Sequence, residues 1–216
     1  AATTALKPQV FEKMKPYFME NYANPSAVYG FAQEAKAAVE DARDSIAGLI
    51  GARANEIYFT GGGSESDNWA IKAAAIALKE KGNHIVTSKI EHHAILHTCQ
   101  FLEKNGFEVT YLDVDSDGMI DIEQLKESIR PTTILISIMY ANNEIGTIEP
   151  VMQIGQIARE YNIIFHTDAV QAFAHIPIDV NKCNIDMMSV SGHKFHGPKG
   201  IGVLYVRKGV PLFNLI

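Results

Sequence analysis

The residues of this sequence most suited to chemistry surround Lys194. Residues 191–200 have the sequence Ser-Gly-His-Lys-Phe-His-Gly-Pro-Lys-Gly and separate two apolar runs, 185–190 and 201–206, which are typical of buried strands. A lysine held just beyond a buried strand, with glycines on both sides, loses its charge more readily than an exposed lysine. It can then form a Schiff base with an aldehyde, and pyridoxal phosphate is the aldehyde that proteins most often hold in this way. The alternative for this motif alone is a surface turn with ordinary lysines.

A carboxylate stands at the tip of another apolar run. Residues 163–168 have the sequence Ile-Ile-Phe-His-Thr-Asp, and Gln171 follows three residues after Asp168. A carboxylate paired with a pyridine nitrogen keeps that nitrogen protonated, which makes pyridoxal phosphate an electron sink. His166 and Asp168 alternate along the strand and suggest a metal pair, but two ligands without a third nearby make a weak metal site. We therefore expect no metal here.

A glycine-rich turn follows the first predicted strand. Residues 60–68 have the sequence Thr-Gly-Gly-Gly-Ser-Glu-Ser-Asp-Asn and lead into a predicted helix. Glycines allow close approach of a ligand to the backbone, and the free N–H groups of a helix start bind anions such as phosphate. The segment matches neither the P-loop nor the dinucleotide-binding pattern. The alternative is a tight turn in which Ser64 caps the helix.

Polar side chains also follow two further strands. Residues 91–93 are Glu-His-His, and the imidazole of His92 could stack on a flat ring, bind a metal or cap a helix. Residues 141–146 are Ala-Asn-Asn-Glu-Ile-Gly, where amides can hold the polar atoms of a ligand or form an Asx-turn.

Strand-like and helix-like patterns alternate along the chain. Seven strands are predicted, over residues 56–60, 84–88, 107–112, 133–139, 163–167, 186–190 and 201–206. Helices are predicted over 65–81, 93–104, 122–129 and 152–161, after a helical lead-in over 1–51 with helices at 8–21 and 30–50 that packs on the larger body. This order is typical of an α/β fold with a mainly parallel sheet covered on both faces, whose ligands bind at the carboxyl ends of the strands.

The composition is that of an ordinary soluble domain, with 216 residues, 47% of them hydrophobic and 20% charged. A net charge of -6 and a pI near 5.7 argue against nucleic-acid binding and favour a small-molecule ligand. Cys99 and Cys183 form no metal-binding pair and suggest a reducing compartment. No apolar run is long enough for a membrane span and no signal peptide is evident, so we expect a cytoplasmic protein without membrane contact.

Five segments of this sequence closely resemble segments of cysteine desulfurases and occur in the same order. They cover residues 60–68, 91–92, 142–146, 166–171 and 191–200. These class-V aminotransferase relatives supply sulfur for iron-sulfur clusters, and the form of the lysine segment resembles their nitrogen-fixation and housekeeping branch. The resemblance implies the large domain of a fold-type-I pyridoxal-phosphate transferase with a mainly parallel seven-stranded sheet. It also implies a parent enzyme that converts L-cysteine to L-alanine and keeps the sulfur as a persulfide.

The same resemblance implies roles for individual residues. Lys194 would form the Schiff base and move the α-proton of the substrate, and His92 would stack on the cofactor ring as the second catalytic residue. Asp168 would pair with the ring nitrogen, Gln171 would bond the ring hydroxyl, and Asn143 would lie near that hydroxyl and the substrate carboxylate. The phosphate would be held by Gly63, Ser64, Ser191 and His193, with Ser64 in place of a threonine common in the family.

The sequence also departs from the family. Members are longer, and the C-terminal half with the nucleophilic cysteine, the carboxylate-binding arginine and the small domain is expected to be missing here. Cys99 and Cys183 are expected to be small buried hydrophobes rather than that nucleophile. The family implies a homodimer in which the partner subunit completes the phosphate site, and a sulfur acceptor such as an iron-sulfur scaffold protein. Two alternatives stay open: a cofactor-binding or interaction module without sulfur transfer, and another fold-type-I enzyme such as a selenocysteine lyase or aminotransferase.

Overall fold

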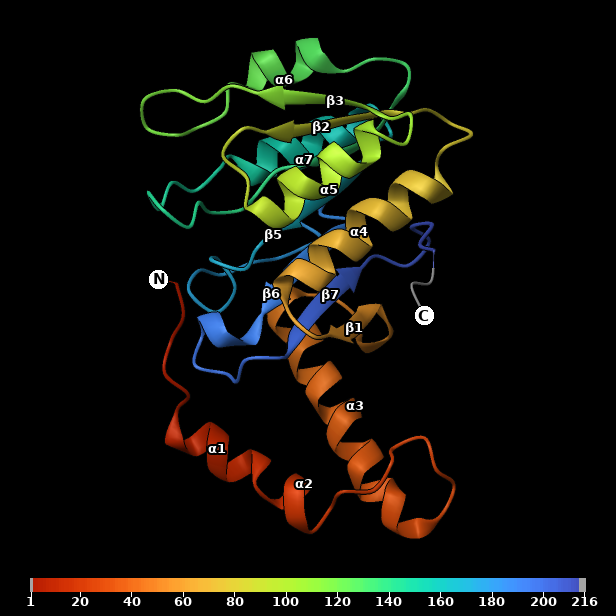
Figure 1. Cartoon of the computed structure of the whole chain (residues 1–216), viewed down its shortest axis with the longest axis vertical. Helices are drawn as coiled ribbons and strands as arrows, with labels where there is room; N and C mark the ends of the chain where they lie inside the picture. Colours follow the sequence, from red (N-terminus) through yellow and green to blue (C-terminus); the bar gives the residue numbers. More distant parts are fainter. Residues whose placement is uncertain (1, 214–216) are drawn as a thin grey trace.

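The computed structural model describes residues 2–213 and contains one seven-stranded sheet with the order β1-β7-β6-β5-β4-β2-β3 (Figure 1). The strands are β1 (Ile57–Thr60), β2 (His84–Ser88), β3 (Glu108–Leu112), β4 (Thr133–Ser137), β5 (Ile164–Asp168), β6 (Met187–Ser191) and β7 (Gly202–Val206). Strand β7 is antiparallel to β1 and β6, and the other neighbouring pairs are parallel. The predicted mainly parallel sheet is therefore confirmed. Only residues 192–201 connect β6 to β7, which is too short for a parallel crossover.

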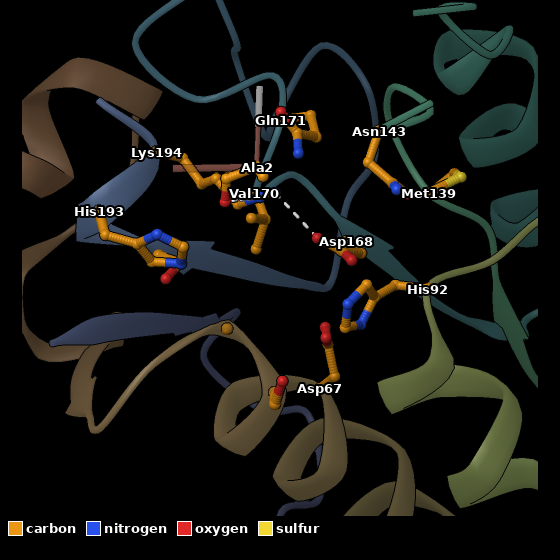
Figure 2. A pocket seen from close by; sticks show the side chains of 13 residues that line it. Ala2, Asp67, His92, Met139, Asn143, Asp168, Val170, Gln171, His193 and Lys194 are labelled. Atoms are coloured by element: carbon orange, nitrogen blue, oxygen red, sulfur yellow. Dashed lines mark hydrogen bonds between the residues drawn. The ribbon is translucent and has the colours of Figure 1, made fainter. Parts of the chain in front are cut away.

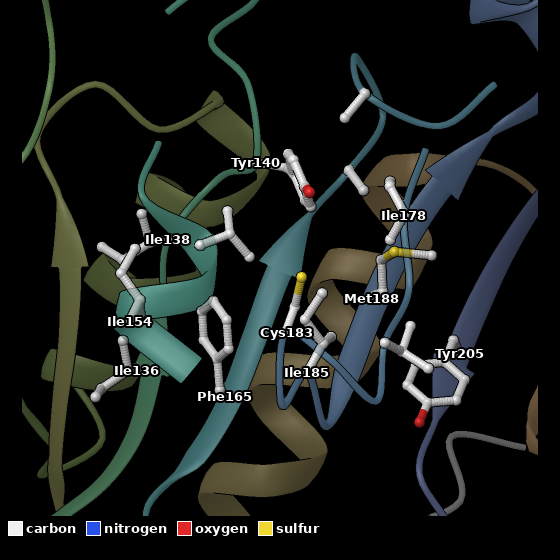
Figure 3. Close-up of a cluster of buried hydrophobic side chains, with 14 of the residues drawn as sticks. Ile136, Ile138, Tyr140, Ile154, Phe165, Ile178, Cys183, Ile185, Met188 and Tyr205 are labelled. Atoms are coloured by element: carbon white, nitrogen blue, oxygen red, sulfur yellow. The ribbon is translucent and has the colours of Figure 1, made fainter. Parts of the chain in front are cut away.

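Helices cover both faces of the sheet, as predicted. On one face, α4 (Gly63–Ala77) and α5 (His93–Glu103) share a buried apolar cluster with the strands. On the other face, the C-terminal end of α3 (Gly30–Ile50) packs with α6 (Ile122–Ser128) and α7 (Val151–Glu160) around the larger cluster. Figure 3 shows part of that cluster, with Phe165 of β5 among Ile136, Ile154 and Ile185. All five residues of β2, β4, β6 and β7 are buried, as expected for strands covered on both faces.

The N-terminal lead-in differs from its prediction. Instead of one helix over 8–21, the structure has α1 (Pro8–Met14) and α2 (Pro16–Met19). The break falls at Pro16 because proline has no N–H to donate to the carbonyl four residues earlier. Within the described chain α1 and α2 contain no buried residue, and Figure 1 shows them projecting below the sheet with the first turns of α3. Only the end of α3 packs on the body, where Ala47 and Ile50 are buried.

Candidate active site

A cavity of about 220 Å³ lies where the carboxyl ends of β5 and β6 meet the first turns of α4 and α5 (Figure 2). All nine residues predicted to bind the cofactor line this cavity. The full lining is Ala2, Gly63, Ser64, Asp67, His92, Met139, Asn143, Asp168, Val170, Gln171, Ser191, His193 and Lys194. These residues come from segments spread over nearly the whole chain, so the fold, and not the sequence order alone, brings them together.

Asp168 is the last residue of β5 and is 6% exposed. The backbone N–H of Val170 donates to its Oδ1 over 2.9 Å, which fixes the carboxyl group at the end of the strand. Burial raises the pKa of Asp168, while the N–H of Val170 and the charge of Lys194 act in the opposite direction. A carboxylate in such a place is stabilised by a cation, and a protonated pyridine nitrogen is one.

The glycine-rich turn forms the start of α4 and offers a place for an anion. The helix begins at Gly63, two residues before the predicted start, and its N-cap Gly62 provides no side-chain cap. The first N–H groups of a helix have no acceptor within that helix, so this end suits a phosphate. Ser64 lies inside the first turn, which rules out the alternative that it caps the helix. A Cβ at Gly63 would lie 2.7 Å from Cγ2 of Val170, so a larger residue here would displace the Val170 side chain.

For His92 the sequence left ring stacking, metal binding and helix capping as alternatives, and the structure shows the capping. Its Nδ1 accepts a hydrogen bond from the N–H of Ala94 over 3.1 Å, which caps α5, and its ring also lines the cavity. The two neighbouring asparagines divide their roles instead. Asn142 forms the Asx-turn, because its Oδ1 accepts from the N–H groups of Glu144 and Ile145, whereas Asn143 lines the cavity. Ring stacking and ligand contacts therefore remain open to His92 and Asn143.

Lys194 ends the short helix η2 (Gly192–Lys194), directly after β6. The residue is half-buried rather than enclosed. Its ammonium group reaches the N-terminal segment and donates to the carbonyl of Ala2 over 3.0 Å. Thr4 anchors that segment. Its N–H donates to the carbonyl of His193 over 2.9 Å, and its Oγ1 accepts from the N–H of His196 over 2.7 Å. The first residues of the chain thus form one wall of the site.

His166 is a structural residue and not a metal ligand. Its Nδ1 lies 2.9 Å from Oγ of Ser137 and its Nε2 lies 2.9 Å from Oγ of Ser189, so the ring links β5 to both neighbouring strands. Burial lowers its pKa to about 3, which leaves the imidazole neutral. The 3.8 Å between its Nε2 and Oδ1 of Asp67 is therefore no ion pair. Residues 2–213 hold no group of three or more side chains placed to bind a metal.

The two cysteines lie away from the cavity. Cys99 is buried in α5, where burial raises the pKa of its thiol to about 12, and burial also raises the pKa of Cys183. Because the thiolate is the nucleophile, neither residue is activated. Both behave as the small buried hydrophobes that the sequence predicted.

Sequence reasoning missed four lining residues: Ala2, Asp67, Met139 and Val170. Val170 could have been found, because it follows Asp168 by two residues in a segment already singled out. Asp67 lies in the glycine-rich segment, but the pattern does not tell which face of α4 it occupies. Ala2 gave no signal, since only the folded chain brings it next to Lys194.

Comparisons with known proteins agree with this arrangement. The family model described as aminotransferase class-V matches residues 1–211. Two proteins named cysteine desulfurase IscS, from Clostridium botulinum (strain Hall) and Methanosarcina thermophila, are each 58% identical over the whole chain, which covers 54% of their length. Among solved structures, "SspA in complex with cysteine" has 49% identity and a TM-score of 0.97, with all of this chain and 62% of that chain covered. A "NIFS-like protein" has 42% identity and a TM-score of 0.97, with all of this chain and 60% of that chain covered.

The chain thus spans about half the length of the curated relatives it matches. In the part of the chain that the structure describes, no helix is both long and apolar enough to cross a membrane.

Proposed function

Because this chain belongs to the class-V aminotransferase family, we propose that it is the large-domain portion of a pyridoxal-phosphate-dependent cysteine desulfurase. The observation that carries the proposal is that nine predicted residues from five separate segments line one cavity of about 220 Å³. The substrate would be L-cysteine, the products L-alanine and enzyme-bound sulfur, and the sulfur would go to iron-sulfur cluster assembly. Relatives named cysteine desulfurase and a solved relative described as a complex with cysteine support this choice.

The residues present fit pyridoxal phosphate at both of its polar ends. Asp168 is a buried carboxyl group suited to the ring nitrogen, and the uncapped start of α4 with Ser191 and His193 suits the phosphate. When bound, the cofactor would supply an electron sink for the substrate. The chain itself would orient the ring with His92, and the amine of Lys194, once neutral, would take the proton from the α-carbon of the substrate.

The proposed sulfur transfer needs a cysteine that reaches this cavity, and Cys99 and Cys183 do not. We place that nucleophile, the arginine for the substrate carboxylate and the small domain in further length of the parent protein, as the coverage of its relatives suggests. We also propose that the parent is a cytoplasmic homodimer whose partner subunit completes the phosphate site, and that an iron-sulfur scaffold or another acceptor protein receives the sulfur.

Titration with pyridoxal phosphate and then L-cysteine, followed by absorbance spectroscopy, tests the proposal. The wild-type protein should gain the visible absorbance band of lysine-bound cofactor, and cysteine should shift it. Lys194→Ala should lose the band but keep the circular dichroism of the fold. Lys199→Ala removes an exposed lysine five residues away and should keep the band.

The outcomes separate the functional alternatives. A band that persists in Lys194→Ala would reject the lysine assignment. A wild-type band with no cysteine-dependent shift would favour a cofactor-binding module. A larger response to selenocysteine or to another amino acid than to cysteine would favour a different fold-type-I enzyme.

A further inference from the structure

Asp67 is a second carboxyl group in the cavity, and neither the sequence motifs nor the roles proposed above use it. It lies in the second turn of α4 and is 1% exposed. Its Oδ1 is buried and has no hydrogen-bond partner within residues 2–213. Figure 2 shows its carboxyl group pointing from α4 toward His92 and Asp168. A buried polar atom left without a partner is costly, so its position in a ligand cavity needs an explanation.

The surroundings of Asp67 hold more acidic than basic groups. Asp168 faces it from β5, and Glu91 lies near it in the turn before α5. His166, also in β5, is neutral and its Nε2 is 2.9 Å from a serine hydroxyl, so it provides no positive charge. Two carboxylates in one site of low dielectric constant cannot both ionise without a large penalty.

The two aspartates are not equivalent. Asp168 accepts a backbone hydrogen bond from Val170, and the positive charge of Lys194 acts on it. Both interactions favour its ionised form. For Asp67, burial and the charge of Asp168 raise the pKa, and a hydrogen bond with a serine hydroxyl opposes them. The proton of the pair therefore belongs on Asp67.

We propose that Asp67 is a positioning residue that carries a proton while Asp168 carries the negative charge, so that the cavity presents one carboxylate and not two. With the carboxyl group of Asp67 neutral, the two aspartates together carry one negative charge. The ring nitrogen of the ligand then meets a negative charge placed on Asp168 alone. The identity of that ligand depends on the proposed function, whereas the location of the proton does not.

The first experiment measures the proton directly in the cofactor-free protein. With aspartate labelled by carbon-13 at Cγ, NMR spectra are recorded as the pH is raised through 7. We expect one aspartate resonance to keep the chemical shift of a protonated carboxyl group at pH 7. It should be absent from Asp67→Asn and present in the control Asp44→Asn, which makes the same change on an exposed part of α3. If every aspartate is ionised at pH 7, or if the protonated resonance survives in Asp67→Asn, the proposal is overturned.

The second experiment measures the affinity for pyridoxal phosphate at pH 7. Asparagine resembles a protonated aspartate in shape and charge, so Asp67→Asn should change the Kd by less than about threefold. Asp168→Asn removes the charged partner and should raise the Kd at least roughly tenfold. A tenfold loss in Asp67→Asn would show that its negative charge is needed and would overturn the proposal. If the wild-type protein binds no pyridoxal phosphate, the proposed function fails, and the NMR result still decides where the proton lies.

Discussion

At the scale of single residues, Glu91 is a buried carboxyl group next to the site. It directly precedes His92, is 5% exposed, and its Oε1 accepts hydrogen bonds from Oγ of Ser88 over 2.7 Å and the N–H of Met139 over 2.9 Å. Its Oε2 has no partner among the described residues. Burial raises the pKa of Glu91 to about 8, so the folded protein holds this carboxyl group in its neutral form.

Glu91→Gln should therefore stabilise the protein, and more so as the pH rises. The pKa of Glu91 is higher in the folded than in the unfolded state, so the wild-type protein loses stability as the pH rises from about 4.5 toward 8. The slope for one such proton is about 1.4 kcal/mol per pH unit. Glutamine keeps both hydrogen bonds to its oxygen and does not titrate in this range.

Urea unfolding of both proteins at pH 5, 6, 7 and 8 measures the difference in the free energy of unfolding. The difference should grow with pH, and Glu80→Gln, on an exposed residue, should show no such trend. A difference independent of pH would contradict the raised pKa of Glu91.

At the scale of elements, most of the secondary structure could be predicted because its signals are local. The seven strands were found from short apolar runs, and the helices from their spacing, with ends displaced by a few residues. The break at Pro16 was missed because the apolar spacing continues across it, although proline itself was a signal. The start of α4 was placed at Glu65, since two residues of its first turn belong to the glycine-rich run.

Helix α7 approaches the turn before β6 so closely that it requires a glycine. A Cβ at Gly155 would lie 1.8 Å from the carbonyl oxygen of Cys183. We expect Gly155→Ala to destabilise the protein by about 1–3 kcal/mol, because backbone would have to move. The higher helix propensity of alanine is too small to offset this.

Gly48→Ala in α3 is the matched control, because a Cβ there meets nothing within 4 Å. This change should instead stabilise by roughly 0.5–1 kcal/mol. Thermal unfolding of both variants checks the opposite signs. Equal effects of the two substitutions would show that the close approach at Gly155 does not decide its stability.

At the scale of the whole molecule, the site depends on contacts between distant parts of the chain. The segments that hold the predicted cavity residues could be singled out because they lie at or after strand ends, which meet at one edge of such a sheet, and the family resemblance then pointed to the individual residues. The wall formed by the first residues could not be found in this way. Thr4 and His196 are 192 positions apart, and no local pattern links them.

Thr4→Val should weaken cofactor binding without unfolding the protein. The change removes the hydroxyl that accepts from the N–H of His196 and donates to the carbonyl of His193 over 3.0 Å, and it leaves a similar volume. Each lost hydrogen bond is worth about 1 kcal/mol, so the Kd for pyridoxal phosphate should rise roughly fivefold or more. Thr4→Ser keeps the hydroxyl and should bind nearly as well as the wild type. If Thr4→Ser and Thr4→Val bind pyridoxal phosphate equally well, the hydroxyl of Thr4 does not support the lysine segment.

The position of β7 has a consequence for the order in which the chain can assemble. Within the described sheet, β1 has β7 as its neighbour, and the register joins Ile57 to Tyr205. Strand β1 therefore gains its hydrogen bonds in this sheet only after β7 has been made. Until then α3 and β1 stay outside the growing sheet, and the segment with Lys194, made just before β7, is synthesised last among the parts of the site. Residues 2–4 can form their wall of the cavity only after the segment with His193 and His196 has been made.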